Sequence, residues 1–143
     1  MYLKYLELFL NCAILIPINN DFIAFMTISK DTKLGSIEIT PDAISAVAGS
    51  SALECYGVVG LAPKNFDAEK KIIPLKANAF KEAIIARKTG KSYVVDVYII
   101  LAYGVKITEI VSEVQKKVKY DLEKKFDLTF SSVNVFVQAL KAV

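Results

Sequence analysis

The side chains that could do chemistry in this chain are few and far apart. The 143 residues include no His, and the only two Cys are Cys12 and Cys55. Without imidazole, the chain lacks the usual base of Ser–His and Cys–His catalysis and a common metal ligand. Asp96 interrupts an apolar run, but no second carboxylate stands at a spacing that would let the two share general acid–base work. The sequence therefore predicts a protein that is not an enzyme, with no catalytic residue, no cofactor and no metal site.

Two short patterns are explained better by structure than by function. Cys12 and Cys55 lack metal-ligand or redox spacing, so Cys55 is predicted to be a reduced core residue, with a disulfide in an oxidising compartment as the alternative. Gly57 and Gly60 have the spacing of a KH-domain loop, but the two residues between them are Val. We interpret this pattern as the end of a helix, with Gly57 left-handed, followed directly by a strand.

The overall charge is too mild to indicate a polyanionic partner. The 18 Lys and Arg exceed the 15 Asp and Glu by a net charge of +3. A Lys-rich helix is predicted at 106–126, but Glu113 and Asp121 each have a Lys four residues later, Lys117 and Lys125. We interpret this face as solvated and ion-paired, which makes nucleic acid an unlikely partner. A small RNA-binding α+β module remains the alternative function.

Composition and length indicate one globular domain that follows an N-terminal stretch of different composition. Apolar residues make up 54% of the chain and charged residues 23%, which excludes a disordered protein. Residues 1–25 form a hydrophobic extension whose clean apolar part is too short to span a bilayer. We expect Met26 to be the natural start, with a peripheral membrane anchor or an added element of the fold as alternatives. The predicted domain is therefore 26–143.

The remaining pattern alternates strands and helices. Strands are expected at 34–40, 58–61, 92–103 and 131–138, and helices at 41–56, 76–88 and 106–126. The first helix has a hydroxyl N-cap at Thr40 followed by Pro41. The order β-α-β-(α)-β-α-β predicts an α+β two-layer sandwich, with helices packed on one face of a small mixed sheet. The strand order within the sheet is left open.

The strand at 92–103 is apolar on both faces except at Asp96. Such a strand is either central and covered on both sides, or one of its faces meets another protein. Tyr98 and Ile100 lie on the face that carries Asp96, and Phe136 of the last strand is expected to join them. These three residues, Tyr98, Ile100 and Phe136, are the candidate interaction surface.

Several blocks in order resemble a known family. They are GSIEITPDAISAVAGSSALECYGVVGLAPKN, VVDVYIILAYGVKITEI and VQKKVKYDLEKKFDLTFSSVNVFVQAL, and the match runs from Leu34 to Ala142. Together they resemble the alkaline shock protein family of Gram-positive bacteria, also called envelope stress response proteins. The family supplies no catalytic residues to transfer to this chain.

The resemblance implies a small cytoplasmic protein that acts in envelope stress response and homeostasis as a non-catalytic adaptor or scaffold. It implies self-association into a homo-oligomer and recruitment by a membrane-anchored protein. Such recruitment would place the chain at the inner face of the cell membrane. No small-molecule substrate is implied.

Overall fold

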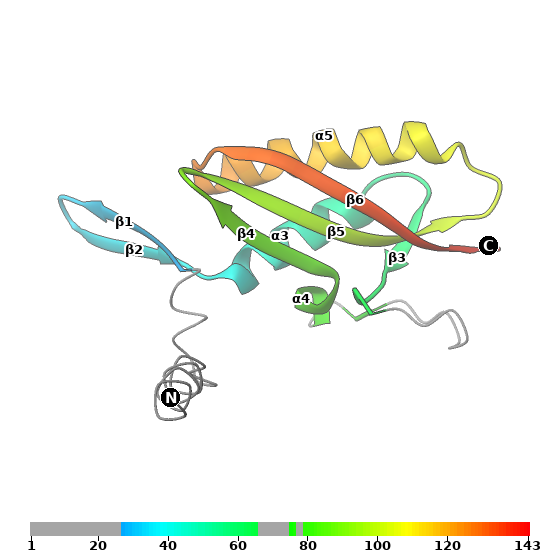
Figure 1. Cartoon of the computed structure of the whole chain (residues 1–143), viewed down its shortest axis with the longest axis horizontal. Helices are drawn as coiled ribbons and strands as arrows, with labels where there is room; N and C mark the ends of the chain where they lie inside the picture. Colours follow the sequence, from blue (N-terminus) through cyan, green and yellow to red (C-terminus); the bar gives the residue numbers. More distant parts are fainter. Residues whose placement is uncertain (1–26, 66–74, 77–78) are drawn as a thin grey trace, which may run out of the picture. The chain divides into compact units, whose positions relative to one another are not determined.

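The computed structural model describes residues 27–65, 75–76 and 79–143 (Figure 1). The chain divides into two compact units, one ending at Glu38 and the other running from Ile39 to Val143. We describe each unit by itself. The hydrophobic extension predicted at 1–25 lies outside the described residues, so its proposed boundary stays a prediction.

The first unit holds a β-hairpin. Strand β1 (Ile28–Thr32) pairs with β2 (Gly35–Ile39) as a two-stranded sheet. The hydroxyl of Thr32 donates to the carbonyl of Gly35 at 2.8 Å and closes the turn. The expected strand at 34–40 is therefore present, but the expectation that it joins the main sheet is wrong. Its partner β1 was not predicted, because four of its five residues are consecutive polar or charged residues (SKDT).

The second unit is built around one central strand, β5 (Ser92–Ala102). Strand β6 (Phe130–Lys141) runs parallel to it along almost its full length. On the other edge, β4 (Ile84–Thr89) pairs antiparallel with the first half of β5, and β3 (Val58–Leu61) with residues near its end. The result is a mixed four-stranded sheet in which β3 and β4 share one edge of β5.

Strand β4 replaces the last part of a predicted helix. The pattern at 76–88 predicted a helix, but α4 occupies only Phe80–Ala83, and the chain then enters β4. Gly90 follows with a φ of +63°, in a tight turn that pairs Thr89 with Ser92. A two-residue loop with Gly at its first position favours a hairpin. Pairing with the strongest strand of the chain therefore overrides a short helical pattern.

Two long helices cover one face of the sheet (Figure 1). Helix α3 (Pro41–Leu53) begins as predicted, since the Thr40 side chain accepts from the Ala43 amide. Its buried residues after Ile44 are small, and a Cβ on Gly49 would lie 2.4 Å from the Phe80 ring. Helix α5 spans Ile107–Phe126. The α+β architecture with helices on one face is confirmed.

The core forms where α5 packs against β6 and α3 packs against β3 and β4, on either side of β5. Helix α5 contributes a buried stripe at helical spacing, and β5 is buried throughout its middle. Its two faces are both covered, which favours the first of the two explanations for its apolar pattern. The largest fully buried side chains include Ile44, Leu61, Ile84, Val95, Val97, Ile99, Ile100, Leu101, Val114, Val118, Leu122 and Phe130.

Candidate interaction surface

The parallel pairing of β5 with β6 brings Tyr98 and Phe136 together. These residues are register partners, and their rings stack with centroids 4.8 Å apart and planes 15° from parallel. Tyr98 is only 7% exposed because Phe136 covers one side of its ring, whereas Phe136 itself is 44% exposed. The sheet therefore presents an aromatic side chain to solvent from its outer strand.

The third member of the candidate surface lies deeper. Ile100 is fully buried, although it shares a face of β5 with Tyr98 by strand alternation. Of the three predicted residues, Phe136 is thus the one with substantial exposed area. Tyr98 stacks against it, and the role of these residues as an interaction surface stays a prediction.

A polar cluster lies beside the aromatic pair on the same face. Asp96 is 4% exposed, and both of its carboxylate oxygens have partners. The guanidinium of Arg87 from β4 donates to one oxygen, and the Asn134 amide from β6 donates to the other at 2.8 Å. Asp96 therefore links three adjacent strands, and each of its carboxylate oxygens is engaged in one of these contacts.

The partners of Asp96 were missed from the sequence. Arg87 was assigned to a helix, where it could not have faced a strand residue nine positions later. Asn134 could have been found, because it shares a strand face with Phe136 and the parallel register then sets it beside Asp96. The alternation of side chains along β6 already placed Asn134 on the face of Phe136. Pairing it with Asp96 also required the register of β6 against β5, which the sequence does not give.

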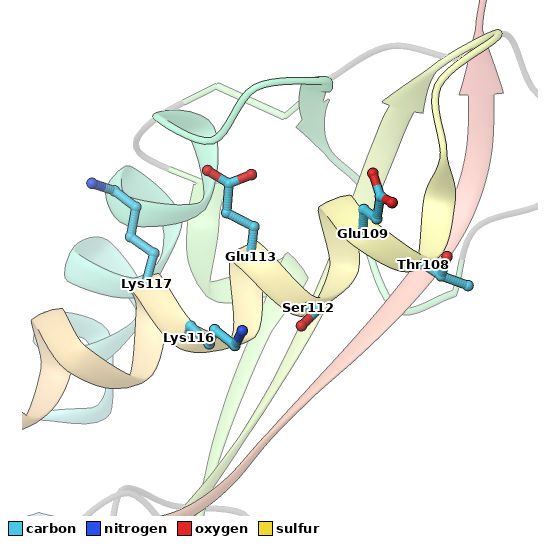
Figure 2. Close-up of a pocket in the computed structure, with 6 residues that line it drawn as sticks. All are labelled: Thr108, Glu109, Ser112, Glu113, Lys116 and Lys117. Atoms are coloured by element: carbon cyan, nitrogen blue, oxygen red, sulfur yellow. The ribbon is translucent and has the colours of Figure 1, made fainter.

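A shallow pocket of about 480 Å³ runs along α5 (Figure 2). Its six lining residues all come from this one helix, and Figure 2 shows Glu109, Glu113 and Lys117 extending to one side while Ser112 and Lys116 extend to the other. Because these side chains diverge, they do not form a convergent binding site. The pocket is best described as a groove on a charged, solvated helix.

The predicted pairing of Glu113 with Lys117 is wrong. The Lys117 ammonium instead lies 3.0 Å from the carboxylate of Glu54, just past the end of α3. Hydrogen bonding to Glu54 and its negative charge raise the pKa of Lys117 above its usual range. The ion pair thus connects α5 to the end of α3 and does not stabilise α5 alone.

An apolar hollow of about 380 Å³ lies near the end of the sheet where β3 begins. Gly57 adopts a φ of +84° there, which confirms its left-handed conformation, although α3 ends four residues earlier at Leu53. Tyr56 and Tyr103 are strongly exposed in the turns at the ends of β3 and β5. The hollow is lined by Tyr56, Gly57, Val58, Val59, Ala102, Val105 and Val143.

Cys55 is a free, buried thiol, as predicted for a reduced core residue. Burial raises its pKa above the ordinary value of 9.0, and the nearby Glu113 carboxylate raises it further. A thiol with a raised pKa is a poor nucleophile at neutral pH, because little thiolate is present. Within the described ranges, no group of three or more His, Cys, Asp or Glu lies close enough to hold a metal ion. No helix in the described part of the chain is long and apolar enough to cross a membrane.

Fold and surface together define a small α+β domain with a stacked Tyr98–Phe136 pair, of which Phe136 is exposed, beside a closed polar cluster on the same face of the sheet. The model of the alkaline shock protein 23 family, described as having a cell envelope-related function, matches residues 29–142. The chain belongs to this family.

The chain is also similar to proteins of two bacteria. The chain is 39% identical to the uncharacterized protein YloU of Bacillus subtilis over 116 residues, which covers 81% of this chain and 97% of YloU. It is also 39% identical to the uncharacterized protein Spy1614 of Streptococcus pyogenes over 118 residues, covering 82% of this chain and 98% of that protein. A second Bacillus subtilis protein, YqhY, is 27% identical over 112 residues, covering 78% of this chain and 82% of YqhY.

Solved structures resemble the fold only loosely. Two variants of MamM-CTD give TM-scores of 0.44 and 0.43 at 16% sequence identity. They cover 70% and 69% of this chain and 98% and 94% of their own. At this similarity, nothing about activity or partners transfers to this chain.

Proposed function

We propose that this chain is a non-catalytic adaptor or scaffold that supports the cell envelope by self-associating and by binding a membrane-anchored protein. The observation that carries the proposal is the family match over 29–142, with its envelope-related function. The proposal places the protein in the cytoplasm, at the inner face of the cell membrane, during envelope stress.

The physical chemistry of the described side chains supports a binding role. Asp96 has both oxygens engaged and Cys55 is buried, so neither offers a free reactive group. Phe136, in contrast, exposes an aromatic ring on a rigid sheet, and exposed aromatic rings are typical anchors of protein interfaces. The surface supports contact with protein better than it supports chemistry.

The test is affinity capture of the tagged protein, at native level, from detergent-solubilised cells. Three forms are compared: the wild type, Phe136→Lys, and Tyr120→Lys as a control that charges an exposed aromatic residue on α5. Each sample is divided, and one half is treated with nuclease. We expect a stoichiometric membrane protein and further copies of the chain with the wild type and the control, with both reduced in Phe136→Lys.

Nuclease separates the two candidate functions. Partners that persist after nuclease support the scaffold, whereas partners that disappear with it support an RNA-binding module and contradict the proposal. A further readout is growth of a deletion strain under envelope stress. Wild type and Tyr120→Lys should restore growth, and Phe136→Lys should not.

A further inference from the structure

Within the described ranges, strand β6 has one edge that pairs with no other strand. It spans Phe130–Lys141, and among the described residues it pairs only with β5. An exposed edge strand presents a row of N–H and C=O groups that can pair with another chain. Proteins usually protect such edges with charged residues, Pro or bulges that twist the edge away.

β6 carries little of this protection. From Phe130 to Leu140 it contains no charged residue, no Pro and no Gly. Two register irregularities interrupt its pairing with β5, near each end, and leave the stretch from Ser132 to Val137 regular. Gln115 of α5 donates to the Val133 carbonyl at 3.0 Å, but a carbonyl oxygen has two lone pairs and can accept a second bond.

We infer that the β6 edge pairs with the β6 edge of a second copy of this chain, antiparallel and across a two-fold axis near Phe136. This inference rests on the self-association in the proposed function and names the surface that provides it. Pairing would join two four-stranded sheets into one continuous sheet.

The second copy fits this edge better than other occupants because the strand is complementary to itself. A strand without charges meets its own copy without repulsion, and a two-fold interface places the same patch on both subunits. Phe136 lies at the middle of β6 and is 44% exposed, so an axis there sets the two rings side by side as a cross-strand aromatic pair. Lys141 then lies opposite Ser131, and no two Lys of the paired strands face each other.

Substitutions of Phe136 by residues of opposite charge test the inference. Phe136→Lys and Phe136→Glu are made separately, and association is measured by sedimentation velocity over a range of concentrations, after circular dichroism has shown that each variant is folded. Like charges across the axis should weaken self-association of each variant at least about tenfold. An equal mixture of the two variants should regain it, because Lys then faces Glu. Tyr120→Lys should associate like the wild type.

The outcomes are distinguishable. A wild type that stays monomeric at all concentrations removes the self-association in the proposed function, and the inference with it. If the wild type associates and both charge variants associate equally well, the β6 edge is not the interface. That result overturns this inference but leaves the proposed self-association in place. Two monomeric variants that fail to rescue each other show that Phe136 meets a different surface, such as the hairpin of another copy or an extended peptide, and this also overturns the inference.

A cross-link provides a second test that needs no charge in the sheet. Phe136→Cys is made together with Cys12→Ser, and Cys55 stays buried. Residues directly opposite in an antiparallel pair have Cα atoms about 4.5–5.5 Å apart, within the range of a disulfide. Mild oxidation should therefore give a covalent dimer that dithiothreitol reverses. Tyr120→Cys in the same background should remain monomeric, and equal cross-linking of both would contradict the predicted register.

Discussion

Asp96 shows how a single polar residue can organise a sheet. Its carboxylate bonds to Arg87 on one neighbouring strand and to Asn134 on the other, so it specifies how both strands align with β5. A shift of β6 by one residue would move Asn134 away and leave a buried carboxylate short of a partner, which is costly. The residue that looked like a possible catalytic acid thus has a structural explanation.

A double-mutant cycle measures this cluster. Arg87→Ala in the wild type leaves the buried carboxylate with Asn134 alone, and we expect a loss of about 1–3 kcal/mol in the free energy of unfolding. In an Asp96→Asn background there is no ion pair to lose, so Arg87→Ala should cost less. The difference should be only about 1 kcal/mol, because Arg87 is half exposed and its ion pair with Asp96 is partly screened. Urea unfolding of the four proteins checks this. Equal costs in both backgrounds would show that the two side chains are not coupled.

Cys55 predicts how stability depends on alkaline pH. Because burial raises its pKa in the folded state, the folded protein holds the thiol proton more tightly than the unfolded chain does. The contribution of the protonated Cys55 thiol to the free energy of unfolding is fully present below about pH 9. It is lost as the pH rises through the folded-state pKa of the thiol. The free energy of unfolding should therefore fall more steeply above about pH 9 for the wild type than for Cys55→Ala.

The comparison between these two proteins isolates the thiol, because they differ only at residue 55. Urea unfolding at several pH values provides the measurement. Parallel pH profiles for the wild type and Cys55→Ala would contradict the prediction.

At the scale of elements, β5 and α5 were predictable and β4 was not. The long apolar run of β5 and the buried stripe of α5, from Ile110 to Leu122, repeat over enough residues to identify each element alone. Strand β4 has six residues, and its apolar positions fit a helix as well as a strand. Only pairing with β5 decides between them, and pairing is a tertiary contact that periodicity does not contain.

The candidate interaction surface could be predicted only in part from the sequence, for the same reason. Alternation alone places Tyr98 and Ile100 on one face of β5. The contact with Phe136 needs the parallel register of β6, and the complete burial of Ile100 depends on packing that no local pattern describes.

The turn after α3 allows a test of close approach between elements. Gly57 combines a φ of +84° with a position where a Cβ would lie 2.3 Å from the Ile110 side chain of α5. Gly57→Ala should therefore cost both backbone strain, about 1–2 kcal/mol, and overpacking, about 1–3 kcal/mol. Gly90→Ala is a matched control, because Gly90 also has positive φ but nothing within 4 Å of the added atom. Thermal or urea unfolding should show the larger loss for Gly57→Ala, and equal losses would rule out the contact with Ile110.

At the scale of the whole molecule, the chain separates into a hairpin unit and the α+β unit from Ile39. An isolated two-stranded hairpin is marginally stable at best. We therefore expect a chain that lacks residues 1–38 to unfold cooperatively in urea, with a free energy of unfolding within about 1 kcal/mol of the full chain. Circular dichroism would confirm its helical content. Loss of cooperative unfolding would show that the hairpin is required for the fold of the second unit.

The shared edge of β5 has a practical consequence for protein engineering. Strand β3 ends with Leu61 opposite Ile99, and β4 starts with Ile84 opposite Val97, so the segment between them leaves and rejoins the sheet only two β5 residues apart. Its ends are fastened by the Leu75 amide to the Leu61 carbonyl and by the Lys64 amide to the Glu82 carbonyl. The entropy of bringing together the ends of a flexible chain segment grows slowly, by about 0.6 kcal/mol for each doubling of its length. A fluorescent reporter or an epitope can therefore be inserted there to follow the protein in living cells, leaving both chain ends and the β6 edge untouched.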